Sequence, residues 1–338
     1  MAVTEAEILD LLRGARANGC QVRVSGGGVS ATPPRDGAVG VSTAGLRGIV
    51  DLRPADFVVT VRAGTPLVEL DAALRAVGRR LPLRPWVVAG RGTIGGAVAA
   101  AADGLTAREG FRWRDVVLGA GAALASGEVV TTGASVVKSV AGFDVPKAWV
   151  GSRGTIGVIL FLTLRIETKP DRSVALSSPL VSVSDVDVLD ALCDALQTPP
   201  RGLVVVPGSA PGSARVHVLF EGGSPALETA AATLRSAGFA AVDDAAATWA
   251  GLTADASAPP PSGLIRRVAR CSRGNPVARV GAHRAGGWVA DVLRQRVTWL
   301  EIAPPPIPDP ASAALFERVR RAFDPDGLFQ PGRGFGAP

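Results

Sequence analysis

Residues 91–100 read RGTIGGAVAA, and residues 153–162 read RGTIGVILFL. The same five residues therefore occur twice, but the sequence that follows each copy is different. Small residues follow the first copy, as in a close-packed helix, whereas β-branched and apolar residues follow the second, as in a buried strand. Glycines bracket a Thr-Ile pair in both copies, and glycine permits tight turns and close approach of the backbone to a ligand. The repeat predicts two related turns that lead into two kinds of element.

A third glycine-rich turn, SGGGVS at 25–30, follows the predicted strand QVRVS. Successive N–H groups in such turns form a concavity that binds anions, and a helix starting directly behind adds its positive end. A single glycine-rich turn is explained by the steric requirement of a tight turn for glycine. Three of them, with serine or threonine hydroxyls in each, favour a diphosphate site.

A Rossmann unit is the alternative explanation of the first copy, because Gly90, Gly92 and Gly95 have the spacing of the dinucleotide fingerprint. That fingerprint also requires an acidic residue about twenty positions on, at the end of a second strand. The nearest candidate, Asp115, instead begins the predicted strand at 115–125. Pro85 also interrupts the strand that precedes the fingerprint, so the pattern disfavours a Rossmann unit.

The composition excludes several classes of site. Of 338 residues, 47% are hydrophobic and 20% charged, which is typical of a folded globular protein. Tyrosine is absent, only two histidines occur, and the three cysteines are widely spaced, so no disulfide framework, zinc site or iron–sulfur site is encoded. The net charge of +6 comes from dispersed arginines without a dense basic run, so we expect no nucleic-acid partner.

Local signals divide the chain into three parts. A capping box at Thr4-Glu5-Ala6-Glu7 begins the first helix, and Thr65 is the predicted N-cap of another. After residue 168 the pattern changes to strand, helix, strand, strand, helix, as in a separate α+β layer. We expect one domain at 1–168, a second at 169–310, and a C-terminal helix and tail at 311–338 that return to the first.

The N-terminus, MAVTEAEILDLL, is acidic and amphipathic, unlike a signal peptide. No run approaches eighteen apolar residues, so the sequence predicts no direct membrane insertion. We expect a cytoplasmic protein, which partners could hold at a membrane.

The order of the motifs along the chain resembles that of a known family. SGGGVS, VRAGTPLVEL, RGTIGGAVAAAADG and GSRGTIGVIL occur in the order found in the FAD-binding domain of the vanillyl-alcohol-oxidase, or PCMH, type. The run VVKSVAGFDVPKAWVGSRGTIGVIL and the terminal FDPDGLFQPGR are similar to the FAD-binding subunit of glycolate oxidase complexes. The resemblance covers residues 20–168 and 323–333, and between them only the length and general pattern match.

The resemblance implies an α+β fold: a PCMH-type FAD-binding domain of two α+β subdomains, with a smaller α+β cap domain built on an antiparallel sheet. FAD would lie extended between the subdomains, with the first RGTIG at its diphosphate and the second beside the flavin end. The cofactor-binding residues implied are Ser25, Gly26, Gly27, Gly28, Val29, Ser30, Thr93, Ile94, Gly95, Gly96, Gly151, Ser152, Gly154, Thr155, Gly157 and Ile159. Lys138 and Asp144 bracket the family segment, either facing the cofactor or forming a solvated pair.

Three departures from the family refine this expectation. Covalent members carry a histidine in the first glycine loop, where this chain has Val29, so the FAD should be non-covalent. Gln330 replaces the usual asparagine near the C-terminus. The histidine-rich metal motif of catalytic relatives is missing, so we expect no metal.

Oxidation of a 2-hydroxy acid needs a base for the hydroxyl proton and a cation for the carboxylate. His283 with Arg284 could supply both, and Arg273 is another candidate cation. His217 lies in the predicted strand RVHVLF, where a structural role is the simpler explanation.

The resemblance implies an FAD-binding oxidoreductase subunit that oxidises glycolate, or a similar small 2-hydroxy acid, to glyoxylate. Without iron–sulfur cysteines of its own, the chain would pass electrons to a partner, in an assembly with a second FAD-containing subunit and an iron–sulfur subunit. Two alternatives remain: an NAD(P)-dependent Rossmann-type dehydrogenase, and a non-catalytic scaffold that has kept the flavin fold.

Overall fold

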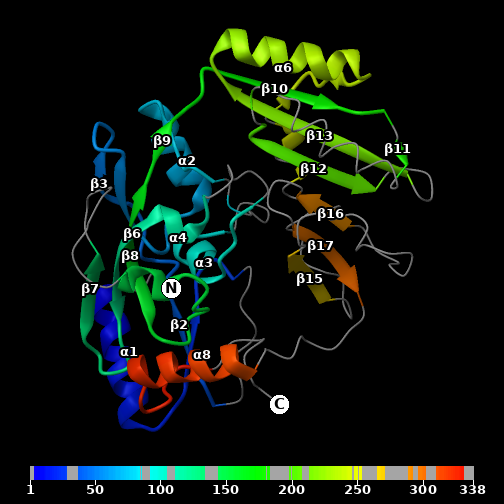
Figure 1. The fold of residues 1–338 in the computed structure, drawn as a ribbon. Helices are drawn as coiled ribbons and strands as arrows, with labels where there is room; N and C mark the ends of the chain where they lie inside the picture. Colours follow the sequence, from blue (N-terminus) through cyan, green and yellow to red (C-terminus); the bar gives the residue numbers. More distant parts are fainter. Residues whose placement is uncertain are drawn as a thin grey trace. The chain divides into compact units, whose positions relative to one another are not determined.

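The computed structural model describes residues 4–28, 37–83, 85, 92–104, 111–133, 144–179, 181–182, 198, 200–207, 213–245, 247–249, 251–252, 265–270, 288–291, 296–301 and 310–330. The chain forms two compact units (Figure 1). Unit 1 contains residues 1–103, 111–168 and 305–338, and unit 2 contains residues 104–110 and 169–304. Within the described residues, every helix is too short or too polar to cross a membrane.

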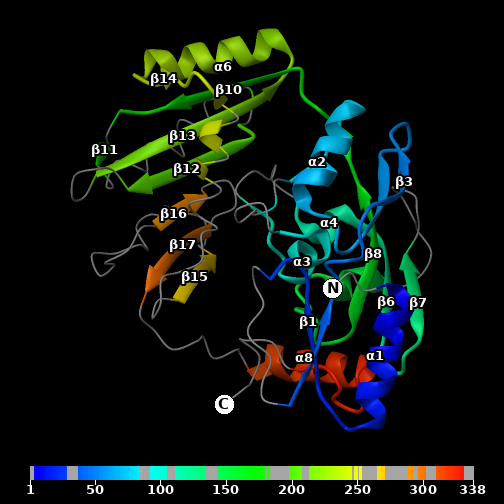
Figure 2. The ribbon, with the colours of Figure 1, turned by 180° about the vertical axis from the view of Figure 1, so that it is seen from behind.

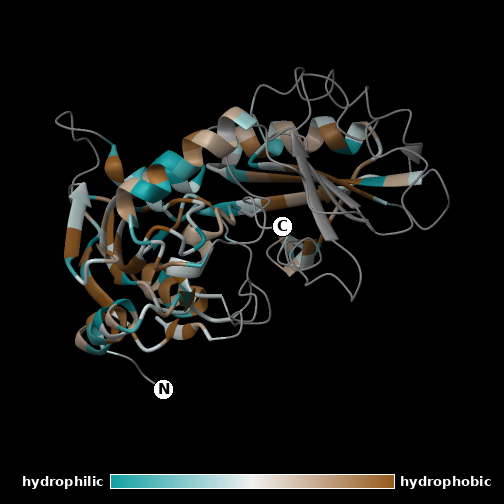
Figure 3. Cartoon of the chain, turned by 90° about the horizontal axis from the view of Figure 1, so that it is seen from below, coloured by the Kyte–Doolittle hydropathy of each residue, from teal (hydrophilic) through white to brown (hydrophobic). Residues whose placement is uncertain are grey.

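Unit 1 begins with helix α1, Glu5–Ala17. The predicted capping box is confirmed: the Thr4 hydroxyl accepts from the Glu7 N–H, and the Glu7 carboxylate accepts from the Thr4 N–H. Gly19, at φ +64°, follows the helix end. Figure 3 shows hydrophilic and hydrophobic residues on different sides of this helix, next to the N label. The apolar side, Ile8 and Leu12, is fully buried.

Strand β1, Val22–Ser25, pairs in parallel with β2, Val39–Ser42, which the sequence did not predict. The C-terminal segment flanks β1 on its other side. The Val22 N–H donates to the Leu328 carbonyl at 2.7 Å, and the Gln330 N–H donates to the Val22 carbonyl at 2.9 Å. Figure 2 shows β1 running between α3 and α8. The strand that leads into the first glycine loop is thus held by residues from both ends of the chain.

A five-stranded sheet forms the centre of unit 1, in the order β3-β4-β8-β6-β7. Its strands are β3 Ile49–Arg53, β4 Val58–Arg62, β6 Val117–Ala123, β7 Val129–Gly133 and β8 Val158–Arg165, and all neighbours are antiparallel. A Rossmann unit requires parallel pairing here, so that alternative is wrong. The expected strand at 115–125 also begins later, because Trp113–Val116 form a short helix, α4, in which the Asp115 carboxylate accepts from the Arg112 N–H.

Short elements connect the sheet to the glycine-rich turns. Helix α2, Leu67–Ala76, begins after Pro66, and α3, Ile94–Ala99, begins after Thr93. The 3₁₀ helix η1, Val145–Trp149, precedes the second RGTIG, and the two-residue strands β5, Arg79–Arg80, and β9, Glu167–Thr168, pair with each other. The prediction that Thr65 caps α2 is wrong, because its hydroxyl bonds the N–H and carbonyl of Gly48 instead. Helix α8, Pro310–Phe323, completes the unit.

Unit 2 contains a largely antiparallel sheet in the order β14-β10-β13-β12-β16-β17-β15, with β11 also paired to β13. The strands are β10 Arg172–Ser177, β11 Val181–Ser182, β12 Gly202–Pro207, β13 Ser213–Gly222, β14 Ala240–Ala241, β15 Ile265–Arg270, β16 Trp288–Asp291 and β17 Arg296–Glu301. Helix α6, Ser224–Ser236, packs on β10 and β13. The last three strands in the chain were not predicted, and the expected helix at 184–197 lies outside the described residues.

Candidate cofactor site

The first glycine loop, Ser25–Gly28, directly follows β1 and has little room for side chains. A Cβ atom on Gly26 would lie 2.5 Å from the Thr93 hydroxyl oxygen, so only glycine fits there. Gly28 has φ +77°, which also favours glycine. Among the described residues, the N–H groups of Gly26, Gly27 and Gly28 find no acceptor. Three consecutive free N–H groups are the donor set that an anion requires.

The first RGTIG copy starts α3 as expected, with Thr93 as the N-cap whose hydroxyl accepts from the Gly96 N–H at 3.3 Å. Gly95 packs against Ala63, since a Cβ would lie 2.9 Å from the Ala63 carbonyl oxygen. The Ile94 N–H donates to Thr65 and the Gly95 N–H to Ala63, at 3.0 and 2.8 Å. These two N–H groups are therefore occupied by protein carbonyls, and their residues help the site by fixing α3 in place.

The second RGTIG copy forms a loop that lies against α3. The Gly151 N–H donates to the Val98 carbonyl and the Arg153 N–H to the Ala99 carbonyl, at 3.0 and 2.9 Å. Gly151, Gly154 and Gly157 all have positive φ. A Cβ on Gly154 would lie 2.9 Å from the Val24 Cβ, so this loop also contacts β1. The chain then enters β8, where Ile159 is buried, and the prediction of a turn followed by a strand is confirmed.

Ser152 is the most informative residue of this second loop. Its side chain is buried, and its hydroxyl oxygen has no hydrogen-bond partner among the described residues. The neighbouring Thr155 hydroxyl donates to the Ser152 carbonyl at 2.6 Å, so it does not serve the Ser152 side chain. A buried polar group without a partner costs about 1–3 kcal/mol. A polar ligand that bonded Ser152 would remove this cost, so the loop fits a cofactor with oxygen or nitrogen atoms at this point.

The structure brings the three glycine-rich segments together, because each contacts another through glycine or backbone atoms. The described members of the expected cofactor set lie in these segments or at the start of β8: Ser25, Gly26, Gly27, Gly28, Thr93, Ile94, Gly95, Gly96, Gly151, Ser152, Gly154, Thr155, Gly157 and Ile159. Val29, Ser30, Lys138, Arg273, His283 and Arg284 lie outside the described residues. Both RGTIG copies contact the same helix: the first copy starts α3, and the second crosses the C-terminal end of α3. This shared helix explains the repeat.

Asp144 directly precedes η1 and lies beside Lys147, which the sequence analysis did not single out. Its exposed carboxylate is 3.9 Å from the Lys147 ammonium. Lys147 is half-buried and donates to the Val117 carbonyl. Burial lowers the pKa of Lys147, and the nearby carboxylates of Asp144 and Asp115 oppose that change. Lys147 thus joins η1 to β6. In the sequence, only its i,i+3 spacing to Asp144 indicated that the two residues could interact.

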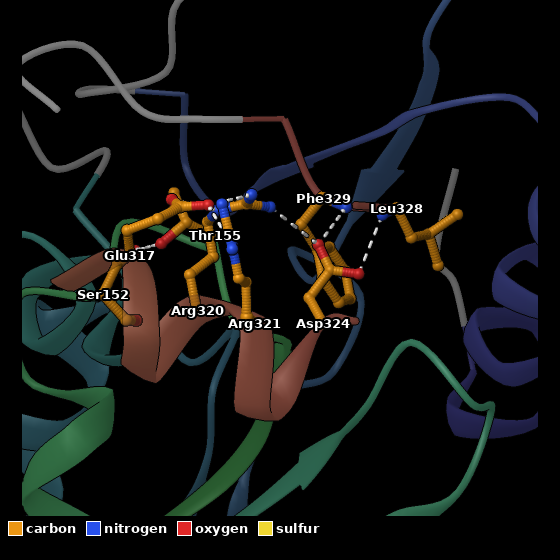
Figure 4. A network of polar contacts seen from close by, with 8 residues as sticks. All are labelled: Ser152, Thr155, Glu317, Arg320, Arg321, Asp324, Leu328 and Phe329. Atoms are coloured by element: carbon orange, nitrogen blue, oxygen red, sulfur yellow. Dashed lines mark hydrogen bonds and ion pairs between the residues drawn. The ribbon is translucent and has the colours of Figure 1, made fainter. Parts of the chain in front are cut away.

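The segment after α8 is organised by a buried carboxylate that sequence patterns also did not reveal. Asp324 is fully buried, and its two oxygens accept from the N–H groups of Leu328 and Phe329 at 2.8 and 2.9 Å. Burial raises the pKa of Asp324, while these two hydrogen bonds oppose the shift. Figure 4 shows Arg320 between this carboxylate and Glu317. Hydrogen bonds from Arg320 and Arg321 lower the pKa of Glu317 to about 2.

The comparisons with known proteins agree with this geometry. Residues 1–133 match the family described as FAD binding domain. The match covers less than half of the chain and identifies an FAD-binding domain of the PCMH type in residues 1–133. FAD is its cofactor. The chain is similar to glycolate oxidase subunit GlcE of Escherichia coli, 37% identical over 130 residues, which are 38% of this chain and 37% of that protein. It is also similar to the mitochondrial D-lactate dehydrogenase [cytochrome] of Arabidopsis thaliana, 33% identical over 149 residues, which are 44% of this chain and 26% of the relative.

Both matches span less than half of the relatives' length. A solved structure of an alkyldihydroxyacetonephosphate synthase has the same fold, with a TM-score of 0.70 and 12% identity over 97% of this chain and 74% of that one. The expected α+β fold with antiparallel sheets is therefore confirmed. The FAD-binding domain uses the parallel pair β1 and β2 to present the first glycine loop.

Gly26→Ala tests the first loop of the FAD-binding domain. The new methyl group would meet the Thr93 hydroxyl, which cannot rotate without releasing the Gly96 N–H that it caps. We expect at least tenfold weaker FAD binding, about 1.4 kcal/mol, measured by fluorescence titration of the apoprotein. Gly14→Ala is the control, because a Cβ there meets nothing within 4 Å. Unchanged affinity in Gly26→Ala would contradict the assigned position of the cofactor.

Proposed function

We propose that this chain is an FAD-binding oxidoreductase subunit that oxidises glycolate, or a similar small 2-hydroxy acid, within a complex. The mutual contact of three glycine-rich segments, one of which contains the buried Ser152 hydroxyl without a partner among the described residues, is the observation that carries the proposal. The names of the relatives, a glycolate oxidase subunit and a D-lactate dehydrogenase, support the 2-hydroxy acid as the substrate class.

In this proposal, the free N–H groups of Gly26, Gly27 and Gly28 hold the diphosphate of FAD. The Ser152 hydroxyl bonds the cofactor near the start of β8. Bound FAD supplies a hydride acceptor for the CH–OH group of the substrate. His283 is the proposed base for the substrate hydroxyl, and Arg284 and Arg273 are the proposed cations for its carboxylate. Val29 stands where covalent members of the family have a histidine, so the cofactor is held without a covalent bond.

The proposed complex contains a second FAD subunit and an iron–sulfur subunit. The word subunit in the name of the Escherichia coli relative supports an assembly. The chemistry of this chain supports it as well. Cys20, Cys193 and Cys271 are too few and too dispersed to hold an iron–sulfur cluster, so electrons leave this chain through another carrier.

The purified chain tests flavin binding, and the assembled complex tests the substrate class. We expect a yellow protein whose flavin is released on denaturation, as for a non-covalent cofactor. Under anaerobic conditions, glycolate should bleach the visible absorption of the assembled complex, and acetate, which lacks the hydroxyl, should not. A folded chain that stays colourless after addition of FAD would refute flavin binding here. A yellow complex that no small 2-hydroxy acid bleaches would refute the substrate class.

A further inference from the structure

Two buried polar atoms without partners lie opposite each other in unit 2. Ser177 on β10 and His217 on β13 are direct register partners in an antiparallel pair. Their side chains therefore project from the same face of the sheet, with Cβ atoms about 4.5–5.5 Å apart. The Ser177 hydroxyl oxygen and the His217 Nδ1 are both buried and lack a hydrogen bond within the described part of the chain. Buried polar groups normally have partners, so two neighbouring exceptions require an explanation.

This face of the sheet is the more open one. On β13, Val216, Val218 and Phe220 are buried, and they alternate with the exposed Arg215 and the half-buried His217. On the face of His217, Leu219 and the β12 register partner Val204 are buried, and the Trp249 ring occupies the space that a Cβ on Gly202 would need. Exposure then increases along β13 from His217 to Arg215. The pair lies at the edge of the covered region.

Arg215 supplies a cation on the same face, two residues from His217 and so about 7 Å along the strand. Its guanidinium donates to the Ser178 carbonyl at 3.5 Å. No carboxylate of the described residues forms an ion pair with Arg215. Burial, and then the charge of Arg215, lowers the pKa of His217, which favours the neutral imidazole. A neutral imidazole beside a cation without a carboxylate partner suits an anion that carries a second polar group.

We propose that Arg215 and His217 bind a small hydroxy-carboxylate on this face of unit 2, and that Ser177 positions His217. Arg215 pairs with the carboxylate, and His217 Nε2 bonds the hydroxyl. Rotation of Ser177 about χ1 brings its hydroxyl to Nδ1, which fixes the proton of the ring on Nε2. The choice of a hydroxy-carboxylate as the ligand rests on the proposed function. The observation of two buried polar atoms without partners is independent of that function.

Because the chain has only two histidines, NMR of protein labelled with 13C at histidine Cε1 tests this directly. Single His217→Gln and His283→Gln variants assign the two signals. We expect the His217 signal to move saturably on addition of glycolate to the apoprotein, and the pKa of His217, which burial lowers in the free protein, to rise beside the bound anion. Acetate should bind at least about tenfold more weakly, since it lacks the hydroxyl.

Variants separate ligand contact from structural effects. Arg215→Gln should weaken glycolate binding at least about tenfold. Ser177→Ala should change the ratio of ring tautomers, and Ser177→Thr should restore it. Arg235→Gln on α6, which loses only an exposed ion pair with Glu228, should leave glycolate binding unchanged. An unmoved His217 signal, or equal affinity in Arg215→Gln, would overturn the inference.

The outcome of the NMR titration is independent of the experiment in which glycolate reduces the flavin. If glycolate bleaches the complex but leaves the His217 signal unmoved, this site is wrong and the proposed function stands. If the signal moves saturably but no 2-hydroxy acid reduces the flavin, the site stands and the proposed function is wrong.

Discussion

We expect Gly64→Ala to abolish FAD binding and to lower the melting temperature of unit 1 strongly. A Cβ on Gly64 would overlap the Thr43 carbonyl oxygen and lie 2.8 Å from the Leu46 carbonyl oxygen. Both are backbone atoms, so no side-chain rotation relieves the overlap. Overpacking costs about 1–3 kcal/mol and occasionally more. At the upper value, the melting temperature falls by roughly 6–12 °C for a unit of this size.

The loss of cofactor follows from the position of Thr43. Its N–H and its hydroxyl both donate to the Ser25 carbonyl, at 2.9 and 3.3 Å. A displaced Thr43 therefore moves the first residue of the first glycine loop. Calorimetry and FAD titration measure the two effects.

The control for this variant is Gly40→Ala on β2. Gly40 is exposed, and a Cβ there meets nothing within 4 Å. Alanine in a strand is favoured over glycine by about 0.5–1 kcal/mol, so we expect equal or slightly higher stability and full FAD binding. If the Gly64→Ala and Gly40→Ala variants had the same melting temperature, the close approach between Gly64 and Thr43 would be disproved.

The second large effect is expected for Asp324→Ala. This change leaves the N–H groups of Leu328 and Phe329 buried without acceptors. Each such group costs about 1–3 kcal/mol, and removal of a buried carboxylate offsets part of this sum. We therefore expect a loss of roughly 2–4 kcal/mol in the free energy of unfolding, measured by urea titration. FAD binding should weaken as well, because the same segment bonds Val22 on β1.

Two further variants make the test specific. Asp324→Asn retains one acceptor and should lose less stability than Asp324→Ala. Asp326→Ala removes a half-exposed ion pair with Arg16 and should change stability by about 1 kcal/mol or less. Equal losses in Asp324→Ala and Asp326→Ala would show that the buried hydrogen bonds do not hold this segment.

Local sequence signals predicted the elements that local chemistry determines. The Thr4 and Glu7 capping box lies within one turn, so four residues were sufficient to place the start of α1. The two RGTIG copies predicted a helix start and a strand entry for the same reason. Glycine-rich turns also predicted the segments of the candidate cofactor site, since the need for small residues is visible in the sequence.

Contacts between distant residues were not predictable in this way. Thr65 has the sequence pattern of an N-cap, but the Gly48 backbone, seventeen residues away, takes its hydroxyl. Asp324 looks like an ordinary turn residue until the fold buries it. Ser177 and His217 become neighbours only through the register of β10 and β13. In each case the partner is set by the fold, which no local pattern encodes.

The pairing of Val22 with Leu328 and Gln330 has a consequence for biosynthesis. The strand that presents the nucleotide loop is translated well before its neighbour, residues 328–330. All of unit 2 is made in between. The first glycine loop can therefore reach its final form only after residue 330 has left the ribosome, and chains that end before Leu328 should accumulate as colourless apoprotein.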